Sequence, residues 1–77
     1  MQNLKTIADL NMGETAYIAD HQEDAIPLKL LQMGCTSNTK IKLSLKAPSS
    51  DPICIHFSGN DVALRLSEAK KIRIKTV

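Results

Sequence analysis

Cys54 and His56 are the two residues of this chain whose types and spacing best suit metal chemistry. Residues i and i+2 of a β-strand project from the same face, so the thiol and the imidazole are expected to lie side by side. A thiolate and an imidazole are two of the four ligands of a tetrahedral zinc site. A closed site would need a second copy of the chain or a distant residue, and two partly exposed side chains on a hairpin are the simpler interpretation.

Possible cation ligands also gather in one short polar loop. They are Asp20, His21, Glu23 and Asp24. Such a group would suit a divalent cation bound weakly at the surface. Carboxylates also collect before helices because the helix N-terminus attracts negative charge. We therefore assign no metal or other cofactor; the weak candidates for a divalent site are His21, Glu23, Cys54 and His56.

Nucleophilic catalysis would need a thiol held by a base, and Cys35 or Cys54 with His21 or His56 could supply those two parts. Cys35 directly follows Gly34, where a helix is expected to end, and a small buried hydrophobic residue explains it better. The sequence has no glycine-rich phosphate loop, HExxH pair or GxSxG elbow. We predict that the protein is not an enzyme and name no catalytic residue.

The composition indicates one small domain over residues 1–77, with no room for a large buried active site. The net charge of +2 and the scarcity of aromatic residues, Tyr17 and Phe57 alone, argue against a nucleic-acid partner. No apolar run approaches the roughly 18 residues that span a membrane, so we expect a cytoplasmic protein without membrane insertion.

Alternating apolar and polar residues predict five short strands. They cover 14–20, 40–46, 53–57, 62–66 and a closing strand that starts at Ile72. The pattern is cleanest in the second, where Ile41, Leu43 and Leu45 are expected to face the core. Turn residues from Ser58 to Asp61 join the third and fourth strands as a hairpin.

Two helical segments separate these strands. The first follows the first strand, with Asp24 as the expected N-cap and Gly34 as the residue that ends it in a left-handed conformation. Its apolar stripe is Ile26, Leu30 and Met33. The second is a single turn before the last strand, with Ser67 as N-cap. Periodicity alone does not distinguish a barrel from a sandwich.

The order of these features resembles the FeoA family. The residues that carry the resemblance are Leu30-Leu31-Gln32-Met33-Gly34, the strand from Thr39 to Ala47, Asp51-Pro52-Ile53-Cys54-Ile55 and Ala63-Leu64-Arg65. It extends from Leu4 to Val77. It implies a mainly β, SH3-like five-stranded barrel with one short α-helix after the first strand and a helical turn before the last. The family usually has a Pro-Gly-like pair where this chain has Ser37 and Asn38, and Asn is the next-best residue for a positive φ.

The resemblance implies a non-enzymatic accessory or regulatory protein of bacterial ferrous iron uptake. Its partner would be a FeoB-type GTP-binding transporter, contacted at the cytosolic side. Recognition commonly lies on loops and exposed faces of a rigid scaffold. The candidate contact residues are Lys29, Gln32, Thr36, Ser37, Asn38, Ser49, Ser50 and Asp51.

Two alternatives stay open. The first is a small transition-metal-binding or metal-sensing domain, because the same barrel resembles the C-terminal domain of iron-dependent repressors. The chain has no helix-turn-helix segment, so it could not recognise DNA by itself. The second is a homodimer bridged by metal through Cys54 and His56.

Overall fold

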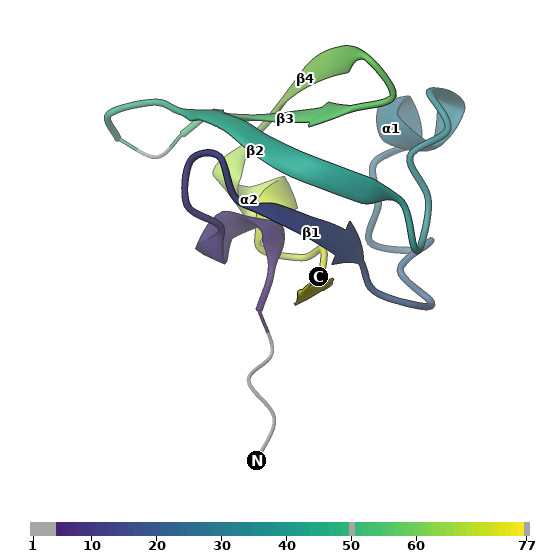
Figure 1. Cartoon of the computed structure of the whole chain (residues 1–77). Coiled ribbons are helices and arrows are strands. Elements are labelled where there is room, and N and C mark those ends of the chain that lie inside the picture. The colour runs from purple at the N-terminus through teal and green to yellow at the C-terminus, as the bar shows by residue number, and fades with distance from the viewer. Residues whose placement is uncertain (1–4, 50, 77) are drawn as a thin grey trace.

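Five antiparallel strands form one strongly curved sheet in the order β4-β3-β2-β1-β5 (Figure 1). The computed structural model describes residues 5–49 and 51–76. The strands are β1 (Thr15–Ile18), β2 (Lys40–Lys46), β3 (Ile53–Phe57), β4 (Asn60–Leu64) and β5 (Ile74–Thr76). Three short helical segments complete the fold: the 3-10 turn η1 (Ile7–Asp9), α1 (Leu28–Gln32) and α2 (Leu66–Ala69). The expected order of strands and helices is confirmed, and η1 is an addition to it.

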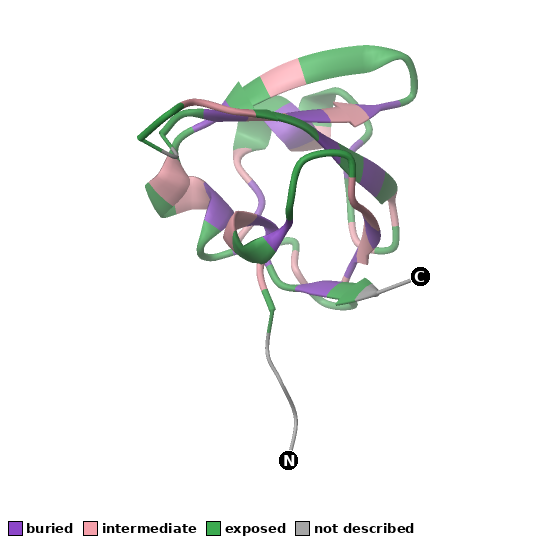
Figure 2. Ribbon diagram, turned by 60° about the vertical axis from the view of Figure 1, so that its left-hand side comes forward, coloured by how far each residue is buried: buried purple, intermediate pink, exposed green. Residues whose placement is uncertain are grey.

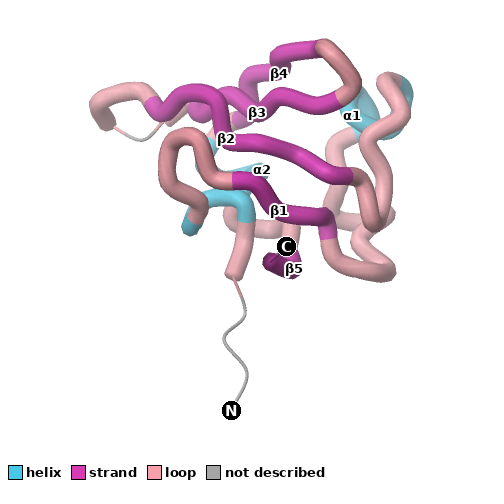
Figure 3. The backbone as a smooth tube through the Cα atoms, viewed as in Figure 1, coloured by secondary structure: helices cyan, strands magenta, loops and turns pink. Residues whose placement is uncertain are grey.

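The sheet is barrel-like without closing (Figure 3). In the described part of the chain, β4 pairs with β3 and β5 pairs with β1, so β4 and β5 are the two edges of the sheet. None of the helices formed by these residues has the length and hydropathy needed to cross a membrane.

The core is aliphatic apart from Phe57, and buried positions alternate with exposed ones along the strands (Figure 2). Ala16 and Ile18 of β1 are buried as predicted, and so are the inward positions of β3. No polar or charged side chain is buried among residues 5–49 and 51–75. Any polar site that these residues form therefore lies at the surface.

A β-bulge in β2 overturns one core prediction. Leu43 faces Ile55 across the sheet, but the next registered pair is Leu45 with Cys54, so β2 has an extra residue there. The Ser44 hydroxyl donates to the Cys54 carbonyl oxygen at 3.2 Å. The shift moves Leu45 to the outer face, where it is 55% exposed, and the expectation that it faces the core is wrong.

Helix α1 begins later than predicted. Proline disfavours the helical conformation in the residue before it, so the helix starts after Pro27 and Asp24 is not its N-cap. Leu30 is fully buried as expected. Met33 lies beyond the last helical residue and is 41% exposed, contrary to the expected stripe. Gly34 has a φ of +90°, as the predicted left-handed helix end requires.

Helix α2 begins at Leu66, a residue that the sequence placed in the fourth strand. Ser67 is therefore inside the helix, and the expectation that it caps the helix is wrong. The first N–H groups bond to two carboxylates instead: Arg65 N–H donates to Glu68 Oε1 and Leu66 N–H donates to Asp51 Oδ1, each at 3.0 Å. The closing strand begins at Ile74 rather than at Ile72.

Candidate functional site

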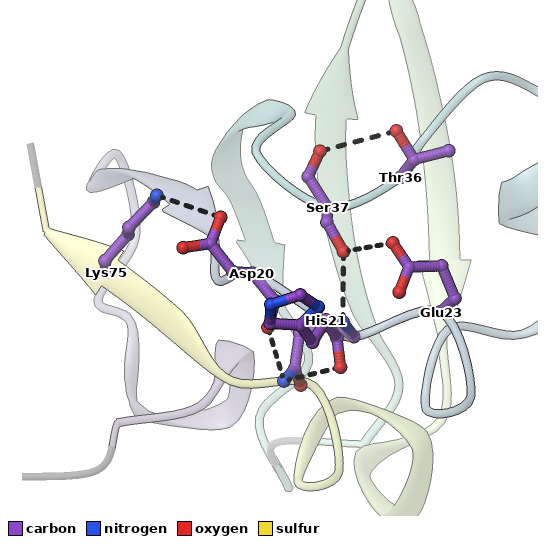
Figure 4. Close-up of polar contacts among 7 residues, drawn as sticks. Asp20, His21, Glu23, Thr36, Ser37 and Lys75 are labelled. Carbon is purple, nitrogen blue, oxygen red and sulfur yellow. Dashed lines mark hydrogen bonds and ion pairs between the residues drawn. The ribbon is translucent and has the colours of Figure 1, made fainter.

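Three segments meet at what we call the loop junction: residues 20–23 after β1, residues 36–38 before β2, and Lys75 of β5 (Figure 4). Ser37 Oγ accepts the Gln22 N–H at 3.0 Å and donates to Glu23 Oε2 at 2.8 Å. The Gln22 side chain accepts the Arg73 N–H at 2.9 Å. These bonds fix two loops and the start of the last strand relative to one another.

The carboxylates of the loop junction have partners within the protein. A hydrogen bond from Asn38 and the nearby Lys75 ammonium hold the pKa of Asp20 below its ordinary value. Asp20 Oδ1 lies 3.5 Å from Lys75 Nζ. The Ser37 hydroxyl lowers the pKa of Glu23 in the same way. Both carboxylates are therefore ionised at neutral pH and directed at protein groups.

The structure does not bring the predicted cation ligands of this loop to one point. Asp20 turns to Lys75, and Glu23 turns to Ser37 (Figure 4). His21 has a φ of +59° and is exposed. Within residues 5–49 and 51–76, no three His, Cys, Asp or Glu side chains are arranged to hold a metal ion.

Cys54 and His56 are both half-buried on β3, and each lies opposite a residue of β4. His56 is opposite Asp61, with Nδ1 2.9 Å from Asp61 Oδ1, and on its other side it is opposite Lys42. The pair could therefore supply Cys54 Sγ and His56 Nε2 to a metal, two ligands in all. Cys35 is fully buried, and burial raises the pKa of its thiol to about 11, so the thiol stays protonated near neutral pH.

A second surface feature, the edge groove, lies between α1 and the free edge of β4. Lys29 Nζ donates to the Ala63 carbonyl oxygen at 3.1 Å and lies 3.7 Å from Glu68 Oε1. The groove has a volume of about 330 Å³. It is lined by Lys29, Asp51, Pro52, Ala63, Leu64 and Arg65. In the described part of the chain the Arg65 guanidinium makes no ion pair.

The predicted contact residues therefore fall into two groups. Thr36, Ser37 and Asn38 belong to the loop junction, where Asn38 has the expected positive φ of +70°. Lys29 and Asp51 line the edge groove, although 22 positions separate them in the sequence. The remaining positions are Gln32, exposed on α1, Ser49, whose hydroxyl donates to the Asp51 carbonyl oxygen, and Ser50, which lies outside the described residues.

Sequence reasoning missed two residues of these surfaces. Gln22 organises the loop junction, but its bonding partners are 15 and 51 positions away, so no local pattern marks it. At the edge groove, Glu68 Oε1 accepts the Arg65 N–H and forms an ion pair with Lys29. The separation of Arg65 and Glu68 by three positions is a capping-box spacing and could have been recognised.

A five-stranded, partly closed sheet with short helices between its strands defines a small β domain of the SH3-like class. Residues 5–76 match the family model described as the FeoA domain, and the chain belongs to this family. The family assignment and the SH3-like fold expected from the sequence are confirmed. Comparison with curated proteins gives no match.

Solved structures agree with this assignment. A FeoA-like protein from Clostridium acetobutylicum is 26% identical, with a TM-score of 0.75 over 100% of this chain and 91% of that one. FeoA from Stenotrophomonas maltophilia, complexed with zinc, is 25% identical, with a TM-score of 0.71 over 92% of this chain and 89% of that one. That protein is described as a prokaryotic SH3 domain protein and a candidate activating factor for ferrous iron transport. A manganese-dependent transcriptional repressor shares the fold at 16% identity, with a TM-score of 0.74 over 100% of this chain and 38% of that one.

Proposed function

We propose that this protein is a non-enzymatic accessory and regulatory protein of bacterial ferrous iron uptake. It acts in the cytoplasm by contacting the cytosolic side of a FeoB-type GTP-binding transporter. The observation that carries the proposal is the family match over residues 5–76. The likeness to the zinc-complexed FeoA, itself described in terms of ferrous iron transport, supports it.

Two exposed surfaces are suited to such contact. The loop junction is fixed by the hydrogen bonds of Ser37 and Gln22, so it can bind a partner with little loss of loop entropy. The edge groove presents Lys29 beside the open side of β4. The neutral, fully buried Cys35 is unsuited to act as a nucleophile, which supports a binding role rather than catalysis.

The test is recovery of a FeoB-type transporter from a detergent extract by the tagged domain. The variant combines Lys29→Glu with Gln32→Glu, which reverses the charge of the exposed α1 face. The matched control combines Lys71→Glu with Asn11→Glu, which changes the net charge equally at exposed positions outside both surfaces. Recovery by the parent and the control but not by the variant supports the proposal. Recovery by none of the three opposes it.

The alternative function, a small transition-metal-binding or metal-sensing domain, is supported by one specific observation. Cys54 and His56 lie half-buried on the same strand, and His56 Nδ1 bonds to Asp61, which leaves Nε2 for a metal. Two such pairs from two copies of the chain would make a tetrahedral site and a homodimer. The fold shared with a manganese-dependent repressor is consistent with this role.

Solution mass measured with zinc and with chelator tests the alternative. A zinc-dependent dimer that is lost in both Cys54→Ser and His56→Gln supports it. A monomer in zinc that retains no metal after gel filtration rejects it. Cys35→Ser is unsuitable as a control because that side chain is in the core, and Ser67→Ala, at an exposed position of α2, serves instead.

A further inference from the structure

The free edge of β4 has backbone groups directed away from the sheet. The β3–β4 hairpin turns through Ser58 and Gly59, whose φ angles are +49° and +79°, and its closing pair is Phe57 with Asn60. In a two-residue hairpin of this kind the closing pair is hydrogen-bonded, and such pairs alternate with pairs that are not. The pairs His56–Asp61 and Cys54–Ala63 are therefore not hydrogen-bonded. The N–H and C=O groups of Asp61 and Ala63 point away from β3, towards the free edge of the sheet.

The contact made by Lys29 independently supports this geometry. Its ammonium donates to the Ala63 carbonyl oxygen from the side of the sheet that lacks a further strand. Within the described ranges, the Ala63 N–H and the backbone groups of Asp61 have no partner outside the β3–β4 pair. An edge with unused donors and acceptors is a template for one more strand.

The charges around the edge groove select the kind of strand. Each carboxylate nearby has a partner: Asp51 accepts the Leu66 N–H, Glu68 accepts the Arg65 N–H, and Asp61 bonds to His56. The Arg65 guanidinium makes no ion pair with any described residue and lines the groove. The ionisable residues of the groove lining are Lys29, Arg65 and Asp51, so the lining carries a net charge of +1, and Arg65 is a cation without an ion-pair partner among the described residues.

A second folded copy of the chain fits this edge poorly. Two copies joined symmetrically at β4 would have to displace both Lys29 ammonium groups from Ala63 and would bring two Lys29 and two Arg65 side chains to one interface. Like charges at one interface oppose pairing. A flexible peptide brings no second lysine and can replace Lys29 at the carbonyl oxygen.

We propose that the edge groove binds an extended peptide that adds to β4 as a sixth strand and places one Asp or Glu side chain against Arg65. The peptide donates an N–H to Ala63 C=O in place of Lys29 and accepts the N–H of Ala63 and of Asp61. The released Lys29 ammonium stays beside Glu68, whose Oε1 lies 3.7 Å from it in the free protein. This inference rests on the proposed binding-module function and specifies the partner's chemistry.

The probe is a capped seven-residue peptide of alternating threonine and valine, with one glutamate at the position that faces Arg65. Binding is followed by amide NMR spectra and hydrogen exchange of the ¹⁵N-labelled protein. We expect the largest shifts at Asp61 and Ala63, and exchange of their N–H groups slowed by about tenfold at saturation. The glutamine version of the peptide should bind about two- to fivefold more weakly.

Two controls separate strand addition from nonspecific attraction. Arg65→Gln should weaken binding as much as the glutamine peptide does and make the protein indifferent to glutamate or glutamine, whereas Arg73→Gln should change nothing. The second control is a peptide N-methylated at the amides that face β4, tested with the unaltered protein. It lacks the N–H donors that strand addition needs, so it should not bind. Equal binding of the N-methylated peptide, or shifts centred on residues 36–38, would overturn the proposal. So would a dimer of the peptide-free protein that protects the β4 amides.

The outcome is separable from that of the transporter experiment. Peptide binding at β4 without recovery of a FeoB-type transporter supports the edge site and rejects that particular partner. Recovery of the transporter with no peptide binding supports the accessory function and overturns the edge site.

Discussion

The side chain of Asp51 caps a helix that begins 15 residues later: its Oδ1 accepts the Leu66 backbone N–H at 3.0 Å. Helix α2 has only the four residues Leu66–Ala69. The first N–H groups of a helix have no partner within the helix, so in α2 they need acceptors from elsewhere. Asp51 was a candidate contact residue from the sequence. The hydrogen bond gives it a structural role, whatever it contacts in a complex.

We therefore expect Asp51→Ala to lower the free energy of unfolding by about 1 kcal/mol, as the loss of a capping side chain does. Urea unfolding followed by circular dichroism measures this change. Ser49→Ala, in the same loop, is the control: among the described residues its hydroxyl bonds to the Asp51 carbonyl oxygen and not to the Asp51 side chain or to α2. An unchanged midpoint for Asp51→Ala would show that the cap contributes no stability.

Because of the bulge in β2, we expect substitutions at two leucines of this strand to differ in their effect on stability. Leu43 is fully buried, and Leu43→Ala should cost about 2 to 4 kcal/mol through lost burial and the cavity left behind. Leu45 is 55% exposed, and Leu45→Thr should change stability by less than about 0.5 kcal/mol. Chemical denaturation of both variants tests the register. Comparable losses at the two positions would place Leu45 in the core.

This strand also shows how far the sequence determines the fold. Alternation identified the strands because one face of each packs on the core, and Ala16, Ile18 and Ile55 are buried accordingly. Alternation does not reveal a bulge, because a bulge is a property of the pairing with β3 rather than of β2 alone. Leu45 was therefore assigned to the wrong face.

The candidate surfaces were only partly predictable for a related reason. Single polar residues in loops were recognised, but the grouping of Lys29 with Asp51 depends on tertiary packing between distant segments. The role of Gln22 depends on Ser37 and Arg73, which no local pattern connects to it. The start of α1, in contrast, could have been predicted from the sequence, because Pro27 disfavours the helical conformation in the residue before it.

The Ser37 hydroxyl should control the titration of Glu23. Its hydrogen bond holds the pKa of that carboxyl below the ordinary value, so Ser37→Ala should raise it towards that value. Because the folded-state pKa is the lower one, the stabilisation is present above the unfolded carboxyl range, near pH 4, and is lost as pH falls through the folded pKa. Side-chain NMR titration of the parent and the variant measures the difference. Identical curves would exclude the hydrogen bond in solution.

The two cysteines should differ sharply in reactivity. Cys35 is fully buried and burial raises the pKa of its thiol to about 11, whereas Cys54 is half-buried on β3. Thiolates are the reactive form, so at pH about 8 iodoacetamide should modify Cys54 and leave Cys35 protected until the protein unfolds. Peptide mass spectrometry after timed labelling measures each rate, and labelling in urea provides the control in which both react. Equal labelling of both thiols in the folded protein would show that the core opens around Cys35 on the timescale of the labelling.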